Sequence, residues 1–300
     1  MWVWRALMAH LGPRELRRFS ADPIEAVDYT LDVDYVGDGI RQHRLDVIVP
    51  QHHADPLPVY VYFHGGGWTS GDKSPLTRYC ASQAVGGMVV VNVNYRMAPR
   101  FHMSHMLQDA NAAVEWVREN IARFGGDPER VVLGGDSAGG QISALLAAAS
   151  SQPEFAGHYS IAPALPASSI RGVVQHCSAV DFSVIFERGF VLGLGFVRML
   201  LPGRGKGQEL AAASKFLSPI EWLDSAYPPV LVTTSRSDFF YRANLNFIEA
   251  LRRHLVPVES LVHDEAVHTW QQDSRHPASR EVYDRLHAFV ARVAGARALA

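Results

Sequence analysis

The feature that most constrains this chain is a serine enclosed by glycines, in the run Gly134-Gly135-Asp136-Ser137-Ala138-Gly139-Gly140. Residues 131–133 before it are apolar and mostly β-branched, whereas residues 141–149 after it are rich in alanine and leucine. This composition predicts a strand, a sharp turn and then a helix. A Gly-x-Ser-x-Gly motif between a strand and a helix is typical of a nucleophile elbow, so the serine is a candidate nucleophile.

The glycines of this motif have a steric reason. At the apex of so tight a turn Ser137 takes a strained backbone conformation, and Gly135 and Gly139 must be small for the strand and the helix to approach each other. The hydroxyl of Ser137 is then expected above the sheet, at the positive end of the helix. There the amide of Ala138 is predicted to help bind a developing oxyanion.

Strands and helices alternate along most of the chain. Two strand-like stretches, 26–36 and 41–49, flank the hairpin signal Gly37-Asp38-Gly39. The later strands are expected at residues 58–63, 88–94, 130–134, 172–178, 230–234 and 258–262, and the helices at 104–123, 137–150, 241–254 and 279–293. This order predicts an α/β fold with a mainly parallel sheet, antiparallel at its start and covered by helices on both faces. A chain of 300 residues, 48% hydrophobic and 19% charged, is long enough for one large domain with a small lid.

Two segments stand outside this alternation. Residues 2–19 carry apolar and basic positions at helical spacing, which predicts that residues 1–25 form an amino-terminal cap helix. For this helix, packing on the surface, cover for an active site and contact with a membrane surface are the alternatives. Residues 26–300 are predicted as the catalytic domain. Within it, the apolar residues 182–216 follow a strand and predict an inserted cap that lines an acyl-binding site, the alternative being an ordinary crossover helix.

Composition argues against several other classes. The net charge of −2 gives no basic excess for binding nucleic acid. Arginines interrupt the apolar start of the chain and no small-residue cleavage site follows it, which predicts neither a signal peptide nor stable membrane insertion. Cys80 and Cys177 match no zinc spacing and are expected to be buried free thiols, as in the reducing cytoplasm. No cluster has the spacing of metal ligands, so no metal or cofactor is predicted.

A second glycine motif, His64-Gly65-Gly66-Gly67, comes directly after the buried strand expected at 58–63. Consecutive glycines leave backbone amides unshielded, so they can point at the oxygen of a tetrahedral intermediate. We predict that Gly66 and Gly67 form an oxyanion hole together with Ala138, while Gly65 shapes the turn. His64 is expected to hold the loop in place rather than to act as a base.

A nucleophilic serine needs a base, and a histidine base needs a carboxylate to orient it. Asp238 follows the strand at 230–234 by four residues, and His268 follows the strand at 258–262 after a similarly short loop. Because the carboxyl ends of parallel strands meet at one edge of the sheet, both side chains are expected to converge on Ser137. The chain order serine, aspartate, histidine is that of the α/β-hydrolases.

Competing residues lie near each of these positions. His263 is on the same loop as His268 and is the alternative base. Asp181 closes the strand before the inserted cap and is the alternative acid, although a role as a loop cap is expected. Asp136 is adjacent to the serine, but its side chain should point away from that of Ser137, which predicts a structural role.

Three motifs in this order resemble those of the hormone-sensitive-lipase-like esterases of the α/β-hydrolase superfamily. They are His64-Gly65-Gly66-Gly67-Trp68, Asn94-Tyr95-Arg96-Met97-Ala98-Pro99 and Gly135-Asp136-Ser137-Ala138-Gly139-Gly140, and the likeness covers about residues 58–290. The resemblance implies an eight-stranded sheet, a helical cap built from the amino terminus and the insertion, and hydrolysis of short acyl esters without metal or cofactor. It also implies that Ser137 is the nucleophile, Asp238 the acid and His268 the base.

The chain departs from that family at three places. Arg100-Phe101-His102-Met103-Ser104 stands where a glutamate and a proline-rich turn are usual, so the rim of the pocket is expected to differ. The acid stands in Ser235-Arg236-Ser237-Asp238-Phe239-Phe240 rather than in Gly-x-x-Asp-Pro-Leu. Trp68 followed by Gly71-Asp72-Lys73 also resembles the loop of aryl-formamidases and of small polyester or feruloyl esterases.

We therefore predict a serine carboxylesterase that hydrolyses short- to medium-chain acyl esters through an acyl-enzyme. Its partner is a small-molecule ester, and the predicted pocket walls are Trp68, Phe186, Phe190 and Leu194. An aryl-formamidase or arylamide hydrolase with the same triad is the alternative, and a non-catalytic ligand receptor on this fold is a more remote one. By analogy alone, a homodimer through the last strand or helix is also an open expectation.

Overall fold

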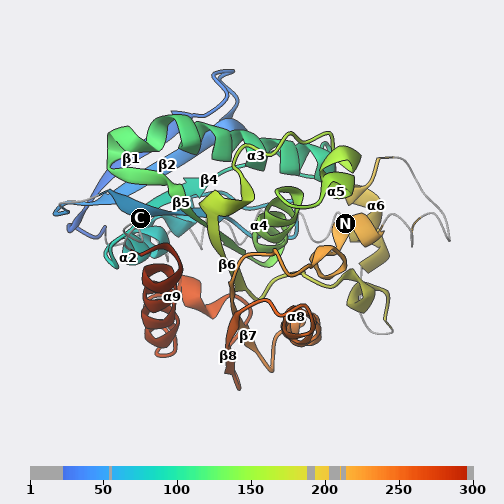
Figure 1. The fold of residues 1–300 in the computed structure, drawn as a ribbon. Coiled ribbons are helices and arrows are strands. Elements are labelled where there is room, and N and C mark those ends of the chain that lie inside the picture. Colours follow the sequence, from blue (N-terminus) through green and yellow to red (C-terminus); the bar gives the residue numbers. More distant parts are fainter. Residues whose placement is uncertain (1–22, 54–55, 188–192, 203–209, 211–213, 296–300) are drawn as a thin grey trace.

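An eight-stranded sheet runs through the molecule (Figure 1). The computed structural model describes residues 23–53, 56–187, 193–202, 210 and 214–295. The strand order is β1-β2-β4-β3-β5-β6-β7-β8; β1 and β2 pair antiparallel, as do β2 and β4, and all later neighbours are parallel. The strands are β1 (Val27–Asp34), β2 (Arg44–Pro50), β3 (Leu57–Phe63), β4 (Val89–Val93), β5 (Gly126–Asp136), β6 (Ile170–His176), β7 (Val230–Ser235) and β8 (Val258–His263). The predicted fold class, a mostly parallel eight-stranded sheet with an antiparallel start, is confirmed.

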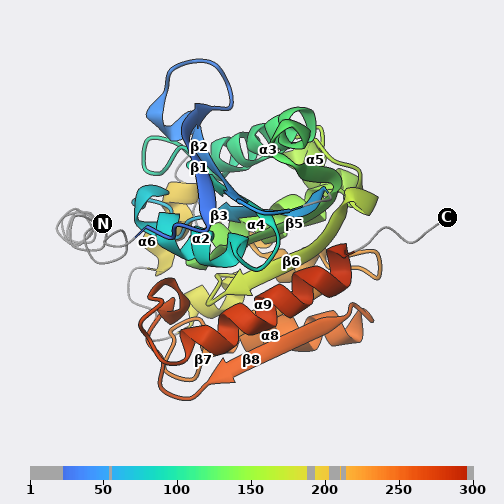
Figure 2. The ribbon, with the colours of Figure 1, turned by 90° about the vertical axis from the view of Figure 1, so that its left-hand side faces the viewer.

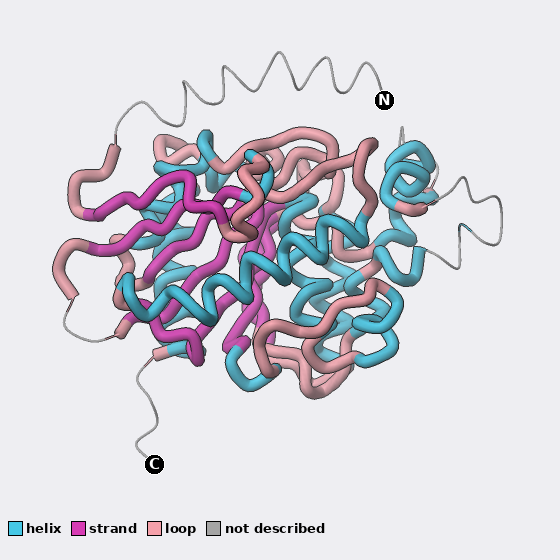
Figure 3. Tube along the Cα trace, turned by 90° about the horizontal axis from the view of Figure 1, so that it is seen from above, coloured by secondary structure: helices cyan, strands magenta, loops and turns pink. Residues whose placement is uncertain are grey.

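Helices cover both faces of this sheet (Figures 1 and 2). Those of the described residues are α2 (Thr77–Ala84), α3 (Met103–Asn120), α4 (Ser137–Ala149), α5 (Pro153–His158), α6 (Gly193–Leu200), α8 (Tyr241–Arg253) and α9 (Ser279–Ala294). Helices α2 and α9 pack on one face, whereas α3, α4 and α8 pack on the other. Seen from above, the direction of the strands changes across the sheet, as expected from its right-handed twist (Figure 3).

The central strands are buried on both sides, which explains their nearly continuous apolar sequences. In β3, the side chains of Val59, Val61 and Phe63 belong to the core under α3 and α4. Tyr60 and Tyr62 point to the opposite face and pack against α2 and α9. Successive side chains of β3 point to opposite faces of the sheet, so they alternate between the two cores and neither face of the strand is exposed to water.

Helix α4 is buried along its whole length. All 13 of its residues are buried, from Ser137 to Ala149. Glycines and alanines make up much of it, and their small size allows the helix to lie against β3, β5 and β6 at once. Packing against the sheet, rather than an exposed polar face, therefore holds this helix in place.

The structure differs from the predicted elements in a few places. Helices α2 and α5 were not expected, and β5 begins at Gly126 rather than at residue 130. The predicted amino-terminal cap helix lies outside the described residues. Of the insertion at 182–216, the described parts include a 3-10 helix (Phe182–Phe186), α6 and a second 3-10 helix (Lys215–Leu217). Cys80 and Cys177 are buried free thiols, as predicted.

Candidate active site

The carboxyl ends of five neighbouring strands bring the predicted residues to one edge of the sheet. Strands β3, β5, β6, β7 and β8 lie side by side and parallel. The glycine motif follows β3, Ser137 follows β5, Asp238 follows β7 and His268 follows β8. The topology therefore places all of these groups at the same edge, as the sequence predicted.

Ser137 occupies the tight turn between β5 and α4. Its backbone φ is 51°, a left-handed value that residues other than glycine rarely adopt. The residue is 7% exposed. A Cβ added to Gly139 would lie 2.0 Å from the carbonyl oxygen of Phe63, and one added to Gly135 would lie 2.5 Å from Gly139 itself. The geometry is thus that of a nucleophile elbow, in which strain is held by close packing of strand and helix.

Asp238 and His268 form a direct pair. The Nδ1 atom of His268 lies 2.5 Å from Oδ2 of Asp238, and the amide of Phe240 donates to Oδ1 at 2.7 Å. The carboxylate is fully buried, whereas the imidazole is 26% exposed. A ring with Nδ1 turned to a buried carboxylate leaves Nε2 as its reactive atom, which is the arrangement of a general base.

His268 also lies near the elbow. Burial raises the pKa of Asp136, the residue before Ser137, to about 6, and the Tyr62 hydroxyl and the His268 ring offset part of that rise. An electrostatic effect of this kind requires that the imidazole be close to the end of β5. Within the described part of the chain the Ser137 hydroxyl makes no hydrogen bond to His268. Such bonds are often long before substrate binds and shorten in the complex.

Asp136 links the elbow to the glycine motif. Its Oδ1 accepts from the hydroxyl of Tyr62 at 2.6 Å and from the amide of Gly65 at 3.0 Å. The residue is 3% exposed. Its side chain therefore binds the backbone of the neighbouring loop through the amide of Gly65, in agreement with the structural role expected for it.

The glycine motif has the backbone conformation that its residues suggest. Gly66 has φ 115° and Gly67 has φ 58°, and a Cβ on Gly66 would lie 2.1 Å from the carbonyl oxygen of Ser70. Among the described residues, no protein acceptor is paired with the amide of either glycine. The ring of His64 stacks on Tyr95 at 4.5 Å, and its Nδ1 is 2.7 Å from the carbonyl oxygen of Gly65. His64 thus holds the loop from inside the protein.

Trp68 lies beneath the inserted segment rather than at an open surface. It is 2% exposed, and its ring lies 5.8 Å from that of Phe182 and 5.5 Å from that of Phe196. The indole Nε1 donates to Oε1 of Gln141 on α4 at 2.6 Å, and Nε2 of Gln141 donates to the carbonyl oxygen of Leu217 at 2.5 Å. The glycine loop, α4 and the inserted segment are thereby joined by hydrogen bonds.

Two of the other predicted pocket residues are exposed. Phe186 is 40% exposed and Leu194 is 46% exposed, and Phe190 lies outside the described residues. Sequence analysis missed Phe239, whose ring lies 4.1 Å from that of His268. It also missed that Cys177, which directly follows β6, has its sulfur within 4.8 Å of a carboxylate oxygen of Asp238 and a ring nitrogen of His268. Position after a parallel strand was the signal that could have identified Cys177.

The competing residues have other partners. Nδ1 of His263 accepts from the amides of Glu265 and Ala266, at 3.2 Å and 3.0 Å. Asp181 accepts from the amide of Ser183 at 2.9 Å and from the side chain of Asn246 at 2.7 Å. These bonds occupy both groups in local loop structure, so the geometry favours Asp238 and His268.

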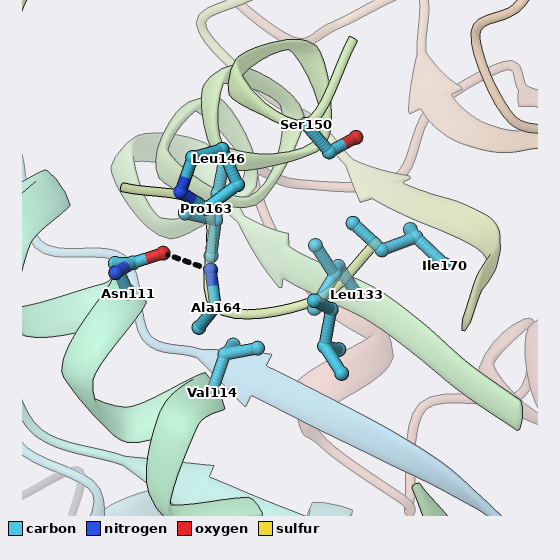
Figure 4. Close-up of a pocket in the computed structure, with 9 residues that line it drawn as sticks. Asn111, Val114, Leu133, Leu146, Ser150, Pro163, Ala164 and Ile170 are labelled. Carbon is cyan, nitrogen blue, oxygen red and sulfur yellow. Dashed lines mark hydrogen bonds between the residues drawn. The ribbon is translucent and has the colours of Figure 1, made fainter. Parts of the chain in front are cut away.

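A small pocket shown in Figure 4 is separate from this group. Its lining includes Leu133 of β5, Val114 of α3, and Ser150, which directly follows α4. Ser137 and Ser150 stand at opposite ends of α4, about 20 Å apart along the helix. The amide of Ala164 donates to Oδ1 of Asn111 at 3.0 Å beside it. This pocket therefore lies behind the candidate site and does not belong to it.

The sequence is similar to those of known hydrolases and esterases. A family model described as alpha/beta hydrolase fold matches residues 60–272. Carboxylesterase NlhH of Mycobacterium tuberculosis is 40% identical over 134 residues, 44% of this chain and 42% of that protein. Esterase LipQ of the same organism is 28% identical over 238 residues, 76% of this chain and 51% of that protein. The chain thus spans about half or less of the length of these curated relatives.

Solved structures share the fold. Esterase B from Lactobacillus rhamnosis superposes with a TM-score of 0.83 at 21% sequence identity, over 96% of this chain and 95% of that one. The same esterase has been solved inhibited by a C4-C4 tributyrin phosphonate. At this identity the likeness concerns the fold alone. Among the described residues of the present chain, no helix is long and apolar enough to cross a membrane.

Proposed function

This chain belongs to the alpha/beta hydrolase family, and on that premise we propose that it is a serine carboxylesterase acting on short- to medium-chain acyl esters. The observation that supports the proposal most is the contact of His268 Nδ1 with Asp238 Oδ2 at 2.5 Å. This pair lies at the same edge of the sheet as Ser137, whose backbone is strained. Along the chain, the nucleophile, the orienting carboxylate and the base each follow a parallel strand, in the order typical of such hydrolases. The proposed partner is a small-molecule ester.

The reaction begins with proton transfer from the Ser137 hydroxyl to Nε2 of His268 as the serine oxygen attacks the ester carbonyl. The oxyanion that forms accepts hydrogen bonds from the amides of Gly66, Gly67 and Ala138. His268 then returns the proton to the leaving alcohol, and the carbon–oxygen bond breaks to leave an acyl-serine. Water attacks this ester by the same steps and releases the acid. Asp238 orients the ring of His268 and stabilises the imidazolium.

The acyl group is proposed to bind under a cap formed by residues 1–25 and 182–216. Phe186, Phe190 and Leu194 are proposed to line the pocket from that cap, and Trp68 contacts the described part of the insertion through Phe182 and Phe196. Because Trp68 is buried and its indole is hydrogen-bonded to Gln141, we propose that it forms a fixed inner boundary of the pocket. The cytoplasmic location and the homodimer remain predictions.

The test is a rate series on p-nitrophenyl esters from acetate to palmitate, measured for the unchanged protein, Ser137→Ala and Ser150→Ala. Ser150 is a matched control because it is a serine at the other end of α4. We expect a maximum at short to medium chains, and a loss of about 10⁴-fold or more in kcat/KM for Ser137→Ala alone. Ester hydrolysis within tenfold of normal in Ser137→Ala, with normal thermal unfolding, would exclude the proposed nucleophile.

Two further measurements separate the alternatives. A formyl-anilide in the same series distinguishes an amide hydrolase, which would cleave it in preference to every ester. A tributyrin phosphonate of the kind that inhibits the Lactobacillus esterase should add its phosphonyl group to Ser137, with loss of the serine proton and of the leaving group on phosphorus. A non-catalytic receptor would show neither turnover nor the added group.

A further inference from the structure

Cys177 occupies the position between the nucleophile and the acid. It directly follows β6, which lies between β5 and β7 in the sheet. Its amide donates to the carbonyl oxygen of Thr233 on β7 at 2.8 Å, and its φ of 48° is left-handed, as is that of Ser137. A left-handed conformation in a residue with a side chain is uncommon and is usually held by its surroundings. The backbone thus aims this side chain in a defined direction.

That direction is toward the candidate acid and base. The sulfur of Cys177, a carboxylate oxygen of Asp238 and a ring nitrogen of His268 all lie within 4.8 Å of one another. Cys177 and the Asp238 side chain are fully buried, so no water screens this contact. Three groups with hydrogen-bonding atoms therefore meet at one point below the exposed edge of the imidazole.

The carboxylate of Asp238 can accept another hydrogen bond. It accepts from the amide of Phe240 through Oδ1 and from His268 through Oδ2. A carboxylate has about four lone-pair positions, so both oxygens can take a further donor. Burying a carboxylate is costly unless such donors surround it.

The thiol is held in its protonated form. Burial, and then the negative charge of Asp238, raises the pKa of Cys177 well above its ordinary value. A protonated thiol is a weak hydrogen-bond donor and neither a nucleophile nor a metal ligand. Asp136 at the end of β5 is a further titratable group in electrostatic contact with both Cys177 and His268.

We propose that Cys177 is a positioning residue whose S–H group donates to the Asp238 carboxylate and tunes how strongly that carboxylate stabilises protonated His268. The inference rests on the proposed function, because it concerns the same acid and base. A donor to the carboxylate draws part of its negative charge away from the imidazolium. Without that donor the imidazolium is more stable, and a higher pH is needed to free the base. A stronger donor has the opposite effect.

The experiment compares kcat/KM for p-nitrophenyl butyrate across pH in the unchanged protein, Cys177→Ala and Cys177→Ser. Relative to the unchanged protein, the pH of half-maximal kcat/KM should rise by about half a unit in Cys177→Ala, which has no donor. It should fall by a similar amount in Cys177→Ser, since a hydroxyl donates more strongly than a thiol. A loss of packing alone would lower the rate without moving this midpoint in opposite directions.

Cys80→Ala is the matched control. Cys80 is the other buried free thiol; it lies on α2 in the same core as Cys177 but outside the group formed by Cys177, Asp238 and His268. Its replacement should leave the midpoint unchanged. Midpoints that coincide with that of the unchanged protein, or that move the same way in both Cys177 variants, would overturn the inference. Should Cys177→Ala not fold, Cys177→Ser decides alone, and an unshifted midpoint refutes the inference.

Failure of the proposed function gives a different result. In that case the unchanged protein hydrolyses no ester at any pH, or Ser137→Ala retains the activity. An active, Ser137-dependent protein with unmoved midpoints leaves the esterase proposal standing and removes only the role of Cys177.

Discussion

The replacement Asp136→Asn should stabilise the protein at high pH and much less at low pH. Asp136 is buried at the end of β5, and burial raises the pKa of its carboxyl from 3.8 to about 6. A raised pKa means that the folded state binds the proton more tightly than the unfolded state does. The contribution of the Asp136 carboxyl to the free energy of unfolding is thus fully present below about pH 4 and is lost as the pH rises through about 6.

The size of this loss follows from the same two values. A rise from 3.8 to about 6 corresponds to about 3 kcal/mol at pH 8 and to about 1 kcal/mol at pH 4.5. An asparagine keeps an oxygen to accept from Tyr62 and Gly65 but carries no charge. The free energy of unfolding of Asp136→Asn, relative to the unchanged protein, should therefore increase by about 2 kcal/mol between pH 4.5 and pH 8.

Urea unfolding at pH 4.5, 6 and 8 measures this difference. Tyr62→Phe is a matched second variant because it removes a donor to the Asp136 carboxylate, so its destabilisation should grow with pH. A difference between Asp136→Asn and the unchanged protein that stays constant over this range would refute the reasoning.

Two predictions concern packing and charge away from the chemistry. The ammonium of Lys73 lies 2.5 Å from the buried carboxylate of Asp46. Lys73→Met should therefore lower the free energy of unfolding by about 3 to 5 kcal/mol. The double variant Lys73→Met/Asp46→Asn should recover much of this in urea unfolding, and no recovery would show that the loss is not one of unpaired charge. Gly139→Ala would place a Cβ 2.0 Å from the Phe63 carbonyl oxygen and should cost several kcal/mol in thermal or urea unfolding. Gly157→Ala, which meets nothing within 4 Å, should be neutral or stabilising by about 0.5 to 1 kcal/mol, and equal losses in the two variants would contradict the packing argument.

The sequence alone was sufficient to predict the buried strands and the residues that follow them, because both depend on the local pattern of apolar residues and on position along the chain. The buried strands have nearly unbroken β-branched runs, and the residues that follow them must meet at one edge. That argument favoured Asp238 and His268 and left Asp181 and His263 as alternatives, and the structure places Asp238 and His268 in contact.

Other features depend on contacts that no local pattern reveals. The start of β5 contains Asp127 and Pro128, which disfavour a strand, yet Gly126 pairs with Leu57 of β3. Helix α2 has only 8 residues, too few for a clear helical period. The proximity of Cys177 to Asp238 depends on the register between β6 and β7.

The complete burial of α4 has a consequence for engineering. A helix without a solvent face tolerates few substitutions, because each larger or polar side chain must displace packed neighbours. A library that randomises residues 138–149 would mostly yield unfolded variants and few new specificities. Diversity placed at exposed positions such as Phe186 and Leu194 would leave this helix and its serine intact. The positions that a selection experiment can vary are therefore exposed ones outside this buried helix.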